Sequence, residues 1–145
     1  MIAFTAALAT ILAAAAPTLS HQATVDHAGT SYQLRYEPQL TTSAKTIGAH
    51  AGARPSTQRC RWTVVVHVER QIGQPGKAHA LSHILPITRQ FSGDLPGSCV
   101  GRATAIDAAQ ASKADAIRAH VAAVAGADRQ TVLAEIDSAR SLALN

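Results

Sequence analysis

The chain has 145 residues, of which 47% are hydrophobic, and its 13 Lys and Arg outnumber its 9 Asp and Glu, for a net charge of +4. A chain of this length can bury roughly two-thirds of the surface that it exposes when unfolded, which favours a single domain. Aromatic residues make up only 3% of the chain. Because stacking on aromatic rings carries much of the affinity for single-stranded nucleic acid, we expect no nucleic-acid partner.

The first 20 residues, MIAFTAALATILAAAAPTLS, form an apolar leader, and the first charged side chain is that of Asp26. The apolar run from Ile2 to Ala16 has the length of a signal-peptide core and is shorter than the roughly 20 residues that span a bilayer. We predict a signal peptide over residues 1–20, cleaved near residue 15 or 20. The mature chain would then be periplasmic or extracellular, with no transmembrane span. Because the leader lacks Lys and Arg, a retained membrane anchor is the alternative, and a buried core helix is a third.

Residues 21–102 favour strands and turns. In SYQLRYE, residues 31–37, apolar and polar side chains alternate as in a half-buried strand. The preceding residues 26–30 include glycine and can turn the chain back. After this strand we predict one weak strand near residues 40–47, followed by a loop over residues 48–58.

The strongest predicted strand is CRWTVVVHVERQI, which begins at Cys60 and is rich in β-branched residues. Its even-numbered positions from Cys60 to Val68 form one apolar face. The turn residues Gly73-Gln74-Pro75-Gly76 follow, and HALSHILPITRQFSG supplies a second strand, so the two form a long β-hairpin. Pro86 lies within the second strand and lacks an N–H group, which predicts an edge strand or a bulge at that point.

Residues 103–145 show helical periodicity, with two apolar stripes separated by Gly126. We predict that Gly126 ends a first helix and that Asp128 caps a second, so that the two form an antiparallel αα-hairpin. Residues 21–145 would then be a single domain, with its β part over 21–102 and a helical hairpin over 103–145. The predicted fold class is α+β, a small antiparallel sheet of three or four strands packed against this C-terminal αα-hairpin.

The chain has two cysteines, Cys60 and Cys99. An even number of cysteines in an exported chain favours a structural disulfide over a catalytic thiol or a pair of metal ligands. We therefore predict a Cys60–Cys99 bond, with the two Cα atoms within about 7 Å of each other.

His67 interrupts the valine run and shares the odd-numbered face of its strand with Glu69. If the hairpin is centred near residue 75, His83 stands opposite His67, and these three side chains could bind zinc or copper. The alternative, which we favour, is that both are half-exposed strand histidines without a ligand, so we predict neither a metal nor another cofactor. The other five histidines are expected at the surface: His21, His27, His50, His79 and His120.

The sequence contains no G-x-S-x-G, H-E-x-x-H or Cys-x-x-Cys motif. We therefore name no catalytic residue and expect a protein without enzymatic activity. The alternative is a small hydrolytic or metal-dependent enzyme whose site is assembled only in the fold.

Positive charge is concentrated before the predicted helices, with 9 Lys and Arg between His27 and Arg102 against Glu37, Glu69 and Asp94. Such a surface attracts anions. We therefore expect an exported protein that binds an acidic envelope component or a protein partner through a basic sheet surface. The candidate contact residues surround the main hairpin: Arg54, Arg59, Arg61, Arg70, Lys77 and Arg89.

Overall fold

The computed structural model describes residues 18–50, 52–53, 57–77 and 81–144. These residues form an antiparallel sheet of four strands in the order β1-β2-β3-β4, followed by two helices. The α+β class is thereby confirmed. The predicted leader lies almost entirely outside the described residues. The elements are β1 (His21–His27), β2 (Thr30–Ile47), β3 (Arg59–Gly73), β4 (Leu81–Pro96), α1 (Ala103–Ala111) and α2 (Ala114–Ala143).

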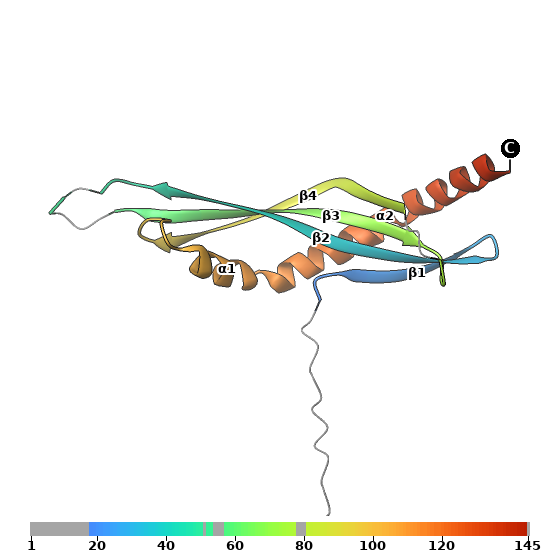
Figure 1. Cartoon of the computed structure of the whole chain (residues 1–145), viewed down its shortest axis with the longest axis horizontal. Coiled ribbons are helices and arrows are strands. Elements are labelled where there is room, and N and C mark those ends of the chain that lie inside the picture. Colours follow the sequence, from blue (N-terminus) through green and yellow to red (C-terminus); the bar gives the residue numbers. More distant parts are fainter. Residues whose placement is uncertain (1–17, 51, 54–56, 78–80, 145) are drawn as a thin grey trace, which may run out of the picture.

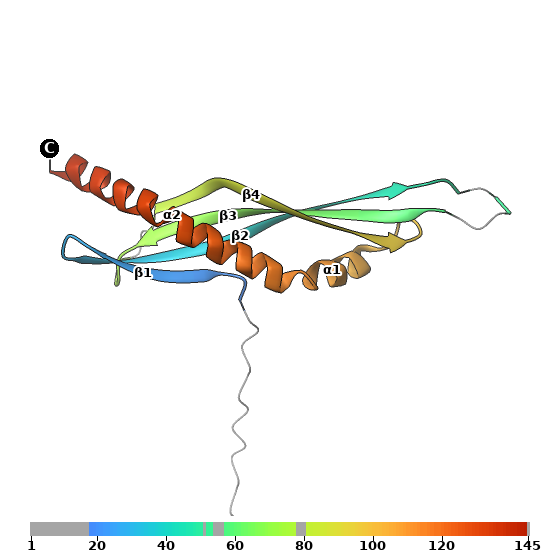
Figure 2. The same cartoon turned by 180° about the vertical axis from the view of Figure 1, so that it is seen from behind.

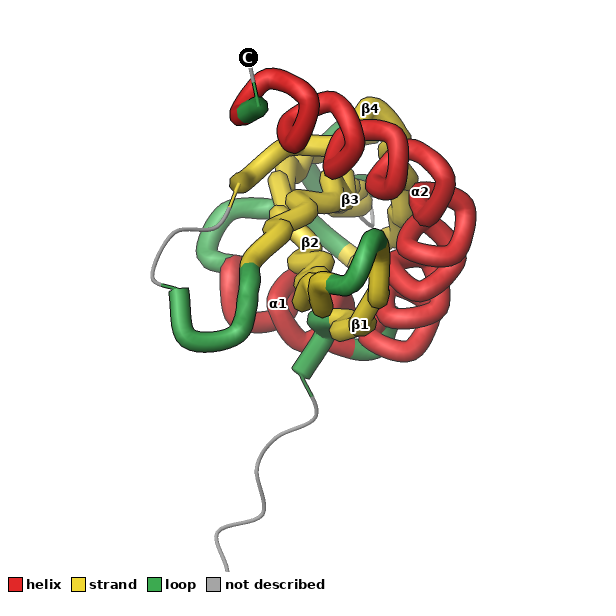
Figure 3. The backbone as a smooth tube through the Cα atoms, turned by 90° about the vertical axis from the view of Figure 1, so that its right-hand side faces the viewer, coloured by secondary structure: helices red, strands yellow, loops and turns green. Residues whose placement is uncertain are grey.

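The molecule is elongated, with long strands β2 and β3 along its axis and both helices on one face of the sheet (Figure 1). Seen from behind, α2 crosses the strands diagonally, and α1 continues the line of α2 toward the far end of β4 (Figure 2). A view along the long axis shows the twist of the sheet, with α2 along one side of it (Figure 3). Among the described residues, no helix lies on the opposite face of the sheet.

The first hairpin confirms the predicted turn, because Ala28 and Gly29 join β1 to β2 and both have positive φ angles, 47° and 78°. Two consecutive residues with positive φ match the right-handed twist of the flanking strands. Strand β2 is 18 residues long, from Thr30 to Ile47, and contains Pro38. Strand β1 begins at His21, which pairs with Tyr36. Pro38 therefore lies where β2 has a neighbour on one side only, and its missing N–H is tolerated there.

The predicted register of the β3–β4 hairpin is wrong. His67 pairs with Thr88, and His83 pairs with Arg70. A shift between His67 and Glu69 changes the register along the hairpin. Pro86 lies in the irregular segment of β4, and β4 is an edge strand. This confirms the prediction of an edge strand or a bulge at this residue, which lacks an N–H group.

The even-numbered face of β3 packs against the helices. Trp62 and Val64 form one buried cluster with Ile106 of α1, and Val66 and Val68 belong to a larger cluster that includes the buried face of α2. In β4, Gly93 stands opposite Trp62, where an added Cβ would lie 2.7 Å from the indole. The ring therefore requires glycine at that position.

The predicted αα-hairpin is wrong, because α2 is one helix of 30 residues that runs through Gly126. Glycine in a helix interior costs about 1 kcal/mol relative to alanine. The free energy gained by packing α2 against the sheet is larger than this cost. Val124 and Val132, on either side of Gly126, are both buried against the sheet. The helical chain breaks instead at Ser112 and Lys113, so α1 and α2 follow one another along the sheet.

Candidate binding surface

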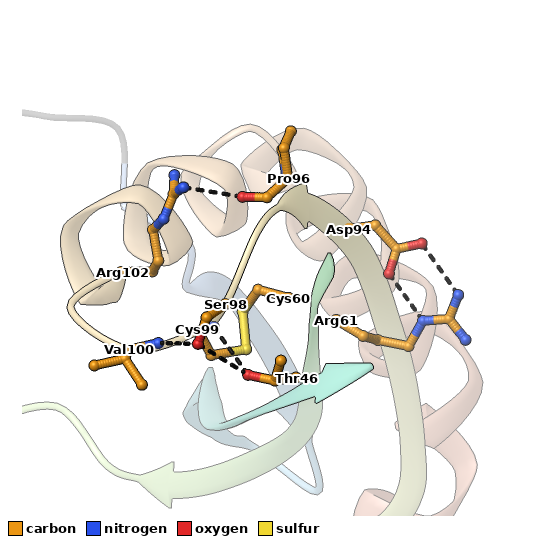
Figure 4. The surroundings of a disulfide bond; sticks show 9 residues. All are labelled: Thr46, Cys60, Arg61, Asp94, Pro96, Ser98, Cys99, Val100 and Arg102. Atoms are coloured by element: carbon orange, nitrogen blue, oxygen red, sulfur yellow. Dashed lines mark hydrogen bonds and ion pairs between the residues drawn. A yellow bond between two sulfur atoms is a disulfide. The ribbon is translucent and has the colours of Figure 1, made fainter. Parts of the chain in front are cut away.

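A disulfide between Cys60 and Cys99 fixes one end of the sheet, with the two Cα atoms 4.7 Å apart. This confirms the predicted bond. It ties the start of β3 to the loop between β4 and α1 (Figure 4). The backbone N–H of Cys99 also donates to Thr46 Oγ1 at 3.0 Å, and Arg102 Nη2 donates to the carbonyl oxygen of Pro96 at 2.9 Å. The ends of β2, β3 and β4 are therefore held together at this point.

Replacing Cys60 and Cys99 together with alanine should lower the free energy of unfolding by about 4 kcal/mol, because the bond closes a loop of 39 residues in the unfolded chain. Urea denaturation of the oxidised parent and the double variant measures this difference. The parent treated with reductant should resemble the variant. Equal unfolding midpoints for oxidised parent and variant would contradict the stabilising role.

Three cations gather on the uncovered face of the sheet beside the disulfide. Lys45 of β2 stands directly opposite Arg61 of β3, and Arg59 lies two residues before Arg61 on the same face. We call Lys45, Arg59 and Arg61 the distal basic patch. All three are exposed. Like charges directly opposite each other, such as Lys45 and Arg61, destabilise a sheet unless an anion offsets them.

One carboxylate borders the distal basic patch. Asp94 of β4 accepts two hydrogen bonds from Arg61, from Nε at 3.0 Å and from Nη2 at 3.1 Å (Figure 4). Arg59 Nε lies 3.9 Å from the same carboxylate. The hydrogen bond from Arg61 lowers the pKa of Asp94 and raises that of Arg61, so both groups stay ionised. Three cations and one carboxylate leave a net charge of about +2 here.

The other predicted contact residues do not lie together on one surface. Arg70 lies in the core, and Lys77 belongs to the β3–β4 turn. Arg89 lies opposite Val66, on the face that the helices cover, with its guanidinium 5.1 Å from the ring of Phe91. Arg54 is outside the described residues. Of the six predicted cations, the distal basic patch contains Arg59 and Arg61.

Arg70 is the centre of a buried ionic cluster. Its side chain is 1% exposed, and its Nη1 donates to Asp128 Oδ2 at 2.8 Å. Its Nη2 donates to Glu135, and the hydroxyl of Tyr36 donates to Asp128 at 3.1 Å. The hydrogen bond from Arg70 lowers the pKa of Glu135. These contacts hold the middle of α2 against the sheet and engage both terminal nitrogens of the guanidinium, so Arg70 has a structural role here.

The histidines and Glu69 proposed as metal ligands do not converge. His67 and His83 pair with different residues, and the carboxylate of Glu69 accepts hydrogen bonds from Gln39, at 3.0 Å, and from Ser82. Within the described ranges, no group of three His, Cys, Asp or Glu side chains is placed to hold a metal ion.

The prediction that the remaining histidines lie at the surface is wrong for His120, whose side chain is 8% exposed in α2. Burial, followed by the charge of Arg89, lowers the pKa of His120. The neutral imidazole is therefore favoured in the folded state. Ile117, Val121 and Val124 lie on the same face of the helix and are buried, and their helical spacing around position 120 in the sequence was the signal for burial.

Acidification should destabilise the protein through His120. Below about pH 6.5 the unfolded chain takes up a proton on this side chain that the folded chain resists. Stability should therefore fall as the pH drops from 7.5 to 5.5. Thermal melts of the parent and of His120→Leu over this range test the effect, and the loss should be smaller in the variant. Parallel pH dependences would show that another group is responsible.

The cations predicted from the sequence did not include Lys45, although the sequence indicates that Lys45 lies opposite Arg61. The loop between β2 and β3 is centred near residue 53, so residues whose numbers sum to 106 stand opposite each other. This rule pairs Lys45 with Arg61, as observed.

In the part of the chain that the structure describes, no helix combines the length and the apolar character needed to cross a membrane. The chain matches no known family model, and comparisons with curated proteins and with solved structures find no similar protein.

Proposed function

We propose that this chain is an exported, non-enzymatic protein that binds an acidic component of the cell envelope through the distal basic patch. The observation that carries the proposal is the pair of facing cations, Lys45 and Arg61, on an uncovered and disulfide-anchored end of the sheet. Like charges in adjacent strands reduce stability unless an anion neutralises them. Asp94 offsets part of this charge through its pairing with Arg61, and a bound acidic group would neutralise the remainder.

The rigidity of this end of the sheet supports the proposal. Arg61 is already oriented by its two hydrogen bonds to Asp94, and the disulfide lies directly beside it in the sequence. Side chains that are ordered before binding lose less conformational entropy when a ligand binds. The predicted leader and the disulfide support export to an oxidising compartment.

An acidic polymer of defined chemistry tests the proposal. The mature protein should be retained on immobilised poly-glutamate at low salt and eluted as salt screens the charges. The triple variant Lys45→Gln, Arg59→Gln, Arg61→Gln should elute at clearly lower salt than the parent. The control triple variant replaces three arginines outside the patch, the exposed Arg35 and Arg129 and the half-buried Arg118, and removes the same net charge: Arg35→Gln, Arg118→Gln and Arg129→Gln.

The control separates a site from general electrostatic attraction. If the distal basic patch is the binding surface, the control variant should elute much closer to the parent than the patch variant does. Equal elution of the two variants would contradict the proposal, because retention would then depend on net charge alone. Thermal melts confirm that both variants are folded before the comparison.

A further inference from the structure

A second candidate site lies at the opposite end of the sheet from the distal basic patch. The last turns of α2 and the β3–β4 turn border a pocket of about 340 Å³. We call it the C-terminal pocket. Figures 1 and 2 show α2 approaching this end of the sheet, well away from α1 and the disulfide loop. The volume is at the lower end of the range of about 300–1,000 Å³ that is typical of small-molecule sites.

The walls of the C-terminal pocket are mainly apolar. Tyr32 and Ile72 contribute from the sheet, and Ile136, Ala139 and Ala143 contribute from one side of α2. Leu81, at the start of β4, also lines the pocket and is 69% exposed, so apolar surface continues from the pocket to its mouth. Such a surface favours a hydrocarbon chain over a fully polar ligand.

Two cations, Lys77 from the β3–β4 turn and Arg140 from α2, line the same pocket. Arg140 Nη1 donates to the carbonyl oxygen of Ala28 at 3.2 Å, which positions the guanidinium and leaves other N–H groups available. Glu135 also lines the pocket, but its carboxylate accepts a hydrogen bond from the buried Arg70, and this ion pair offsets its negative charge. The pocket therefore combines apolar walls with two cations.

We propose that the C-terminal pocket binds a single-chain amphiphile with a carboxylate head, the chemistry of a fatty acid. The hydrocarbon chain packs against Ile72, Ile136 and Ala139, and the carboxylate is bound by Arg140 and Lys77. A guanidinium binds a carboxylate through paired hydrogen bonds, and these strengthen as the apolar chain displaces water. This site is independent of the distal basic patch.

Isothermal titration calorimetry with decanoate, below the concentration at which it forms micelles, tests the proposal. One decanoate should bind per chain. Decyltrimethylammonium, which has a cationic head and an alkyl chain one carbon longer, and acetate, which has the same head and almost no chain, should both bind far more weakly. Equal binding of decanoate and decyltrimethylammonium would overturn the role of the cations, and absence of decanoate binding would overturn the assignment of the site.

Variants locate the ligand. The double variant Lys77→Gln, Arg140→Gln should weaken decanoate binding by about tenfold or more, while the charge-matched Arg118→Gln, Arg129→Gln should bind as the parent does. Ala139→Trp places a ring in the pocket and should abolish binding; Ala143→Trp offers a second position if the first variant is unstable. Both alanines are exposed, so thermal melts should remain close to that of the parent. Unchanged binding in the folded tryptophan variants would overturn the assignment.

The same titration distinguishes this site from the proposed envelope contact. The patch variant Lys45→Gln, Arg59→Gln, Arg61→Gln should bind decanoate with the affinity of the parent. Loss of decanoate binding in the patch variant, with retention in the pocket variants, would place the amphiphile at the distal basic patch and overturn the inference.

Discussion

Replacing Val64 with aspartate should largely unfold the protein, with a loss of at least about 4 kcal/mol. Val64 is fully buried between Trp62 and Ile106, in a cluster whose other members are apolar or disulfide-bonded. A carboxylate there would have neither water nor a cation to stabilise it. Because single domains are stable by only about 5–15 kcal/mol, this loss is a large part of the total. Urea denaturation followed by Trp62 fluorescence measures it.

The adjacent position supplies the control. Val65 lies on the opposite, uncovered face of β3 and is half-buried, between Thr41 and Gln90 on the neighbouring strands. Val65→Asp can keep its carboxylate hydrated and should cost no more than about 1 kcal/mol. Similar losses for Val64→Asp and Val65→Asp would contradict the assignment of the two faces.

Replacing Arg70 with methionine should lower the free energy of unfolding by about 3–5 kcal/mol. Methionine replaces the aliphatic stem of the arginine side chain, but it leaves the carboxylate of Asp128, which is 8% exposed, without its cation. The hydroxyl of Tyr36 would be the remaining partner of Asp128 among the contacts described for it. Glu135, at 47% exposed, can be hydrated and should contribute less. Chemical denaturation at pH 7 measures the loss.

A second substitution distinguishes an uncompensated charge from lost packing. Asp128→Asn removes the negative charge and keeps an oxygen that can accept from Tyr36. The double variant Arg70→Met, Asp128→Asn should therefore recover at least half of the stability that Arg70→Met loses. If the double variant is as unstable as the single variant, the packing of the arginine stem, and not the charge, is what stabilises the structure.

The alternating pattern of β3 predicted its two faces, because strand side chains repeat every two residues and the valine face had to be buried. The disulfide could be predicted from the even cysteine count. The register of β3 and β4 could not, because it depends on the irregularity between His67 and Glu69, which shifts every pairing beyond it. The proposed pairing of His67 with His83 was wrong because it assumed a hairpin centred near residue 75, whereas the numbers of paired residues sum to 153 on the turn side of the irregularity and to 155 beyond it.

Gly126 shows the limit of local propensity. In sequence it resembles a helix end, but valines at positions 124 and 132 and the contact of Asp128 with Arg70 hold both sides of the glycine against the sheet. Tertiary contacts therefore decide the continuity of α2. Arg70 was predicted as a surface cation for a similar reason, since its acidic partners lie about 60 residues away in the chain.

The distal basic patch depends on the β2–β3 register and on an uncovered sheet face, and its footprint can be measured directly. Two-dimensional ¹H–¹⁵N NMR spectra of the mature protein, recorded during titration with soluble poly-glutamate, locate the contact residue by residue. We predict that the amide shifts change most near Lys45, Arg59 and Arg61 and decrease as salt is added. Shifts centred on α2, or spread evenly over the surface, would contradict the account.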